Sequence, residues 1–118
     1  MDANDSLQLL RAKLAEFAAE RDWDQFHNPK NLAMAMAVEV GELLEHFQWL
    51  SEVEAAALSS ANKAEVAMEM ADVFMFLLRL ADKLDVDLIK VAGEKMELNR
   101  QKYPVEKARG RATKYDKL

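Results

Sequence analysis

The stretch MAMAVEVGELLEHF, residues 34–47, has helical spacing and a mostly apolar composition, yet Glu39 and Glu42 lie in its middle. Its alanine, methionine, leucine and glutamate residues all favour helix. Carboxylates are rarely buried unless a partner neutralises them. The stretch therefore predicts an apolar helix in which the two glutamates face something that offsets their charge.

A second stretch, VAMEMADVFMFLLRLA at residues 66–81, repeats this pattern with Glu69 and Asp72. A helix that is apolar on nearly every side has to be covered on nearly every side. The other helices of one small chain cover two such helices poorly, and soluble monomers rarely expose large apolar patches. We therefore expect both helices to pack against another subunit; the alternative is a monomeric bundle with an exposed patch.

The composition of the 118 residues indicates one helical domain, with only three glycines, two prolines and no cysteine. The absence of cysteine excludes a disulfide framework and a thiolate metal site. The net charge is −5, but residues 105–118 carry five basic and two acidic side chains, so the rest is more acidic still. An acidic body argues against nucleic-acid binding and suits a site that gathers cations. With an acidic N-terminus and no long apolar run, we expect a cytoplasmic protein.

Periodicity and capping residues predict an all-α subunit of four helices. The expected helices span residues 6–21, 29–49, 62–83 and 87–103, with Asn28 as the cap of the second and Asp87 as the cap of the fourth. The linker between the second and third helices is expected to hold one short helix, because Ser51 and Glu54 have capping-box spacing. Pro104 ends the last helix, which gives a helical domain over residues 1–104 and an irregular basic tail over residues 105–118.

Glu39 and Glu42 share one helix face, and Glu69 and Asp72 repeat that arrangement on the next apolar helix. If the two helices pack antiparallel, the carboxylates converge in an apolar layer, where unpaired charges would cost several kcal/mol each. No lysine or arginine lies in residues 32–49 to neutralise them. Hard divalent cations such as Mg²⁺ take oxygen ligands and would neutralise the cluster, so these carboxylates are a candidate metal site for phosphate chemistry.

These carboxylate pairs have two other interpretations. A single Glu-x-x-Glu pair is most often a solvated helix face, and that interpretation stays open for this chain. A ferritin-like di-iron site requires a glutamate three residues before a histidine on two helices. Neither His27 nor His46 is preceded in this way, so that site is excluded.

The carboxylates stand in two motifs, EVGEL at residues 39–43 and EMAD at residues 69–72. This order of E-x-x-E and E-x-x-D resembles the signature of MazG-like nucleotide pyrophosphohydrolases. The segments FAAERDWDQFHNPKNL (17–32), EHFQWL (45–50) and NRQKYPVEKARGRATKY (99–115) resemble the dCTP pyrophosphatase branch of that family. Together they cover most of the chain.

The resemblance implies an all-α subunit that assembles as a dimer or a dimer of dimers, with Mg²⁺ held by Glu39, Glu42, Glu69 and Asp72. It also implies nucleotide-pool house-cleaning, in which a dNTP is hydrolysed between its α- and β-phosphates to dNMP and pyrophosphate. The expected substrates are dCTP and modified dCTP. Among these glutamates we select Glu42 as the candidate general base for the attacking water.

The same resemblance places Trp23, His27 and Trp49 around the nucleotide base. Phe76, one turn after Asp72, stands where vertebrate relatives have a tyrosine. It can pack against a base but has no hydroxyl group to donate, which leaves dATP open as a substrate. From the residues alone, each tryptophan is better explained as a partly buried packing residue, and only the resemblance reverses that interpretation.

Lys95 and Asn99 lie one turn apart on the last helix and so share a face. The resemblance implies that Lys95 meets the phosphates and that Asn99 binds the nucleotide. Tyr103 is a further candidate for substrate binding, although its place before Pro104 also suits a helix end. From the residues alone, the lysine is equally well explained as a solvated side chain.

Two further function classes remain as alternatives. One is a helical oligomeric binding module that holds a partner with its apolar helices and buffers metal with its carboxylates, without turnover. The other is a nucleic-acid binder, suggested by the basic tail and two tryptophans and disfavoured by the acidic body. A pure interaction protein has no need of four carboxylates inside apolar helices, so the enzyme is favoured.

Overall fold

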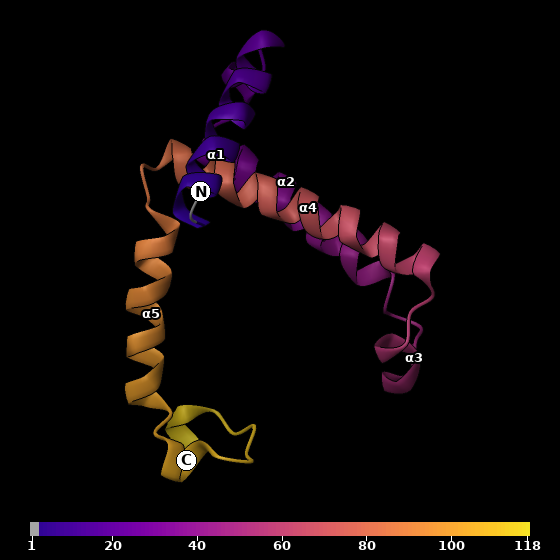
Figure 1. Cartoon of the computed structure of the whole chain (residues 1–118), viewed down its shortest axis with the longest axis vertical. Coiled ribbons are helices and arrows are strands. Elements are labelled where there is room, and N and C mark those ends of the chain that lie inside the picture. The colour runs from indigo at the N-terminus through magenta and orange to yellow at the C-terminus, as the bar shows by residue number, and fades with distance from the viewer. Residues whose placement is uncertain (1–2) are drawn as a thin grey trace. The chain divides into compact units, whose positions relative to one another are not determined.

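The structure, a computed structural model, describes residues 3–118, with side chains from Asp5 onward. Every regular element in this range is a helix, which confirms the predicted all-α class (Figure 1). The chain divides into two units, one ending at Val86 and the other beginning at Asp87. The predicted division into a helical domain and a tail after residue 104 stays a prediction.

The three longest helices of the described residues belong to the first unit. The first contains α1 (Ala3–Glu20), the 3₁₀ helix η1 (Asp24–Phe26), α2 (Pro29–Glu45), α3 (Glu52–Ala56) and α4 (Ser60–Lys83). The second contains α5 (Leu88–Lys102), α6 (Val105–Ala108) and the 3₁₀ helix η2 (Tyr115–Lys117).

Side-chain caps set the start of most of these helices. Asn28 caps α2, because its side-chain oxygen accepts a hydrogen bond from the Asn31 N–H at 2.9 Å. Ser51 and Glu54 form a reciprocal capping box at α3, and Asp87 caps α5. These three caps confirm the predicted ones. Ser59 caps α4 in the same way, so that helix begins at Ser60, slightly earlier than expected.

Two helix ends differ from the expectation. Helix α2 ends at Glu45 rather than near residue 49. The amides of the next two residues donate to carbonyls three residues back, at 3.2 Å from His46 to Leu43 and at 2.9 Å from Phe47 to Leu44. The tail is not irregular throughout. Pro104 ends α5 and also starts α6, since its carbonyl accepts from the amide of Ala108 at 2.9 Å.

The chain leaves α1 through a left-handed residue that is not glycine. Asp22 has a φ of 56°. Its N–H donates to the Ala19 carbonyl at 3.1 Å, and the Trp23 N–H donates to the Ala18 carbonyl at 2.9 Å. The Gln25 side chain holds the turn by donating to the Asp22 carbonyl and carboxylate, each at 3.0 Å. This turn fixes the backbone position of Trp23.

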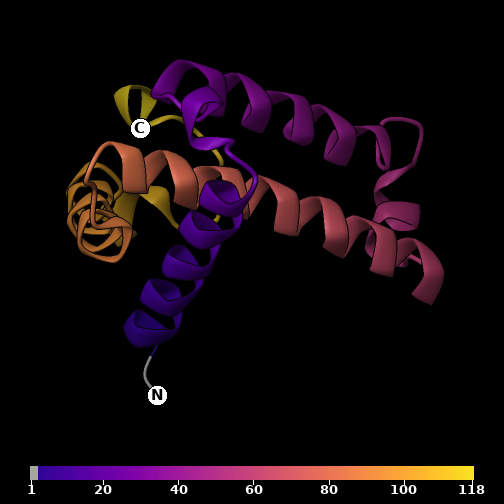
Figure 2. The same ribbon diagram turned by 90° about the horizontal axis from the view of Figure 1, so that it is seen from above.

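Helices α2 and α4 lie side by side and run in opposite directions, and α1 contacts α4 (Figure 2). The predicted antiparallel packing of the two apolar helices is therefore confirmed. Among the described residues, the buried apolar side chains come from these three helices, and they are Ala18, Leu32, Val66, Leu78 and Ala81. Leu32 is only 1 % exposed, so it is the central side chain of this small core.

Several large apolar side chains of α2 and α4 remain more than half exposed. They are Met34, Val38, Leu44, Met68 and Met70. Such an accumulation on two adjacent helices marks a surface that a partner covers in many proteins. Within the described residues, none of the helices combines the length and the apolar character needed to cross a bilayer.

Replacement of Leu32 by alanine should destabilise the fold by about 2–5 kcal/mol, because it removes buried methyl groups and leaves a cavity between α2 and its neighbours. Urea denaturation monitored by circular dichroism at a fixed protein concentration measures the change. Val53→Ala is the matched control, since Val53 is 80 % exposed and its truncation should change stability little. Equal losses for the two variants would contradict the assigned core.

Candidate active site

Three carboxylates from two helices converge in the first unit. One oxygen each from Glu39 of α2 and from Glu69 and Asp72 of α4 lies within 4.8 Å of the others. The spacing of three residues on α4 puts Glu69 and Asp72 on one face, and the antiparallel packing brings Glu39 opposite them. All three side chains are partly buried.

Two oxygens of this cluster lack a partner. Glu39 Oε2 and Glu69 Oε2 are buried and make no hydrogen bond with any described residue. Burial, the adjacent Glu42 carboxyl group, and the charges of Asp72 and Glu69 raise the pKa of Glu39 to about 7. The pKa of Glu69 is also raised, first by burial and then by Glu42. The cluster is therefore a group of like charges that the protein alone does not neutralise.

These residues fit a hard divalent cation. The donor set consists entirely of carboxylate oxygens, two of which are buried without a partner. Among the described residues, no lysine or arginine forms an ion pair with the cluster. Glu42, the fourth predicted carboxylate, is exposed and lies outside the close group, although it interacts with both Glu39 and Glu69.

A cavity of about 400 Å³ lies next to the cluster, with Asp72 belonging to both. Its volume is in the range of small-molecule sites. The walls come from α1, the connector around η1, and α4. They are formed by Lys13, Leu14, Phe17, Ala18, Trp23, His27, Asp72, Met75, Phe76 and Arg79.

Three of the predicted base-binding residues, Trp23, His27 and Phe76, line this cavity together. The Trp23 ring packs edge-on against Phe17, with ring centroids 5.7 Å apart, and lies 6.4 Å from the His27 ring. Such aromatic surfaces suit a flat heteroaromatic ring. The cavity therefore places a surface for a base beside a cluster for a cation.

The remaining predicted site residues are not among those that line the cavity. Trp49, just after α2, is 86 % exposed and does not line the cavity. Lys95 and Asn99 are exposed on α5 in the second unit. Tyr103 ends α5, and its ring packs edge-on against Tyr115 with centroids 6.1 Å apart. A role for these four residues in substrate binding stays a prediction.

The sequence analysis missed the part of the wall that α1 supplies, including Leu14 and Phe17. Their helical spacing is the same for a core position and for a cavity wall, so the sequence does not distinguish the two roles. It also missed Arg79, which is only 5 % exposed although charged. A signal did exist there, because Asp72, Phe76 and Arg79 follow one another at helical spacing on one face of α4.

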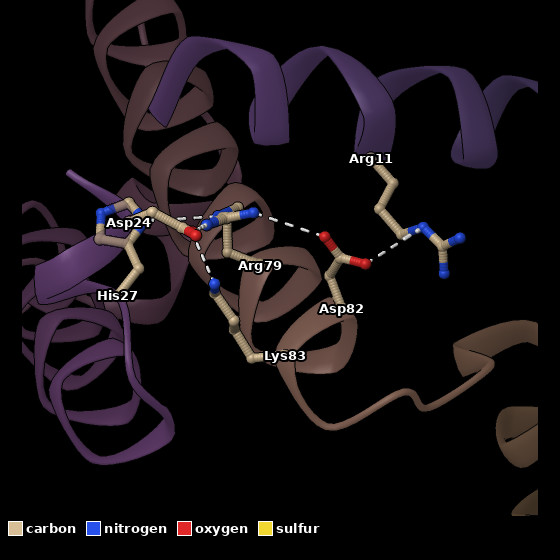
Figure 3. Close-up of polar contacts among 6 residues, drawn as sticks. All are labelled: Arg11, Asp24, His27, Arg79, Asp82 and Lys83. Carbon is tan, nitrogen blue, oxygen red and sulfur yellow. Dashed lines mark hydrogen bonds and ion pairs between the residues drawn. The ribbon is translucent and has the colours of Figure 1, made fainter. Parts of the chain in front are cut away.

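Arg79 is the centre of a polar cluster at one wall of the cavity, which we name the Arg79 cluster (Figure 3). It contains Arg11, Asp24, His27, Arg79, Asp82 and Lys83. The Arg79 guanidinium bonds to His27 Nδ1 at 3.3 Å and to the Asp24 carboxylate at 3.0 Å. The pKa of Asp24 is lowered by its hydrogen bonds to Lys83 and Arg79.

Comparison with known proteins gives consistent relatives. The model of the MazG-like family matches residues 34–118. The dCTP pyrophosphatase 1 of Rattus norvegicus is 47 % identical over 115 residues, which are 96 % of this chain and 68 % of the rat protein. The Homo sapiens protein of the same name is 44 % identical over the same shares of the two chains.

A solved structure is similar as well. The crystal structure of a pyrophosphatase from Archaeoglobus fulgidus matches with a TM-score of 0.80 and 42 % identity, over 84 % of this chain and 93 % of that chain. The family model includes all of the clustered carboxylates and one part of the cavity wall, whereas α1 precedes it. The match to the family model over residues 34–118 and the identity to these relatives show that the chain belongs to the MazG-like family.

Proposed function

We propose that this chain is a Mg²⁺-dependent pyrophosphohydrolase that cleaves dNTPs to dNMP and pyrophosphate, with dCTP and modified dCTP as preferred substrates. The observation that carries the proposal is the junction at Asp72 of a carboxylate cluster and an aromatic cavity. The relatives named dCTP pyrophosphatase support the reaction and the base. The work of such an enzyme is to keep surplus or altered nucleotides out of the pool.

Glu39, Glu69 and Asp72 would hold the divalent cation, with Glu42 completing the set at the exposed edge. A bound Mg²⁺ would offset part of the triphosphate charge and make the α-phosphorus more electrophilic. The protein's part is to fix the carboxylates before the substrate arrives. The core between α2 and α4 does this, because it sets the distance between their backbones.

In the proposed reaction a water molecule attacks the α-phosphorus in line with the bond to the oxygen that bridges the α- and β-phosphates. That bond breaks, and its electron pair leaves with pyrophosphate. Glu42 accepts the proton of the water, a role that suits its exposed position beside the cluster. The product that remains is the nucleoside monophosphate.

The base would lie in the cavity between Trp23 and Phe76, close to His27. Trp49 and Tyr103 are proposed as additional contacts to the nucleotide. Lys95 is proposed to meet the phosphates and Asn99 to bind the nucleotide, since the two side chains share one face of α5. Phe76 supplies packing without a hydroxyl group, which leaves room for other dNTPs such as dATP.

We further propose that the exposed apolar face of α2 and α4 is covered by a second copy of the chain, in a dimer or a dimer of dimers. The support is the run of more than half-exposed side chains on both helices, with Met34 and Met68 among them. The proposed setting is the cytoplasm, where the dNTP pool is used. The lack of cysteine in the chain suits that reducing compartment.

The reaction class can be tested with a panel of canonical and modified dNTPs and NTPs, each incubated with and without Mg²⁺. Anion-exchange chromatography resolves the products. We expect dNMP and pyrophosphate in equal amounts only with Mg²⁺, and fastest with cytosine nucleotides. Nucleoside diphosphate and phosphate would mean that a different bond is cleaved, and no turnover would favour the binding module.

Glu39→Gln and Glu69→Gln should each lower kcat/KM for dCTP by at least about 100-fold, because each removes a charged ligand from the cation site. Steady-state kinetics at saturating Mg²⁺ measures the loss. Glu65→Gln is the matched control, since it makes the same change one turn earlier on α4 at an exposed residue. Near-normal turnover of both cluster variants would exclude these carboxylates as the catalytic site.

Metal-free protein should lose stability as the pH rises through the folded pKa of Glu39, which is raised from 4.5 to about 7. The folded state holds this proton more tightly than the unfolded state does, so the stabilisation is full below the unfolded pKa and disappears above the folded one. Thermal unfolding in chelator between about pH 5 and about pH 8 should show a falling Tm.

Two controls make the pH measurement specific. Mg²⁺ should raise the Tm most at the high end of the range, because the ionised cluster then binds it. Glu39→Gln should flatten the slope, whereas Glu65→Gln should leave it unchanged. A pH dependence of the Tm that is the same in Glu39→Gln and in the wild type would contradict the assigned burial of Glu39.

A further inference from the structure

The Arg79 guanidinium is held from three sides at the wall of the cavity. Its Nε donates to His27 Nδ1 at 3.3 Å, one terminal nitrogen donates to Asp24 at 3.0 Å, and the other donates to Asp82 at 3.4 Å. The side chain is only 6 % exposed (Figure 3). A planar group with a partner on each nitrogen has one orientation.

Both carboxylates that hold Arg79 have a second cation. Lys83 donates to the same Asp24 oxygen at 2.6 Å, and Arg11 lies 3.5 Å from the other oxygen of Asp82. The cluster thus connects α1, the connector and α4, the elements that form the cavity. The orientation of Arg79 is therefore set by several elements at once rather than by one neighbour.

This geometry determines which ring nitrogen of His27 carries a proton. Arginine has only N–H groups to offer and cannot accept, so His27 Nδ1 has to be the acceptor with a free lone pair. In a neutral imidazole the proton then resides on Nε2. A doubly protonated ring would place an N–H against the N–H of Arg79 and two positive charges side by side.

The surroundings also keep the ring neutral. Burial first, and then the positive charge of Arg79, lower the pKa of His27 from its usual 6.5. Asp24 acts in the opposite direction and Lys83 in the same direction as Arg79. The ring lines the cavity, and among the described residues no hydrogen bond is made by its Nε2.

We propose that Arg79 is a positioning residue that fixes His27 in its neutral Nε2–H form, so that the cavity offers a permanent hydrogen-bond donor to an unprotonated ring nitrogen of the bound base. The inference rests on the proposed function and names its selectivity. Cytosine and adenine have such an acceptor, at N3 and N1. Thymine, uracil and guanine carry a hydrogen at the corresponding atom, so the fixed donor meets another donor and rejects them.

The tautomer is tested directly by ¹H–¹⁵N long-range NMR of the full chain without nucleotide. The chain has two histidines, and His46→Gln leaves only the His27 signals. We expect Nε2–H in the wild-type protein across neutral pH. A wild-type ring with its proton on Nδ1, or one averaged between both forms, would overturn the inference without touching the proposed function.

Variants then test the role of Arg79. In Arg79→Leu, Asp24 retains Lys83 and Asp82 retains Arg11 as a partner. We expect the His27 proton to be shared between the two ring nitrogens. We also expect the preference for dCTP over dTTP, measured as the ratio of their kcat/KM values, to fall by at least about tenfold. Arg79→Lys keeps a cation that only donates but loses the planar fork, so its preference should lie between those of the wild type and Arg79→Leu. Lys63→Met removes an exposed cation of α4 that lies outside the Arg79 cluster, and should leave the tautomer and the preference unchanged.

A double variant separates positioning from a general structural effect. If Arg79 acts through His27, the preference lost in Arg79→Leu with His27→Ala should equal that lost in His27→Ala alone. Additive losses, or an unchanged tautomer in folded Arg79→Leu, would refute the inference. If no variant and no wild-type protein turns over any nucleotide, the proposed function fails, while the NMR result still decides the tautomer.

Discussion

The antiparallel contact between α2 and α4 is the interaction on which the rest of the structure depends. It buries Leu32 and Val66, and it brings Glu39 opposite Glu69 and Asp72 in the same layer. The free energy gained by burying the apolar side chains offsets the free energy that desolvating the carboxylates costs. A site that would not assemble by itself is thus held together by the core beside it.

The same layer gives the chain two opposing requirements. The carboxylates have to be close and partly buried to bind a cation, and that arrangement costs stability when they are ionised and alone. Ion binding relieves the cost, so fold and site are coupled. The Arg79 cluster differs from the carboxylate cluster, because its cations and carboxylates neutralise one another within the protein. One cluster is open to a ligand and the other provides rigidity.

Local patterns in the sequence predicted the helices, the caps at Asn28 and Ser51, and the convergence of Glu39 with Glu69. Each depends on residues a few positions apart, or on the pairing of two strongly apolar helices. The wall from α1 and the ion pair of Arg79 with Asp24 depend on segments far apart in the chain, 55 positions in the second case. Periodicity carries no information on such distances, so these features required the structure.

The left-handed turn at Asp22 has a consequence for binding. The hydrogen bonds of the turn place the Trp23 backbone, and the Phe17 ring supports the indole, which nevertheless remains 43 % exposed. A ring that is accessible but already oriented loses little conformational entropy when a flat ligand stacks on it. The strain of a non-glycine residue at positive φ is stored in the free protein. In return for that strain, the Trp23 ring is already oriented when a ligand binds.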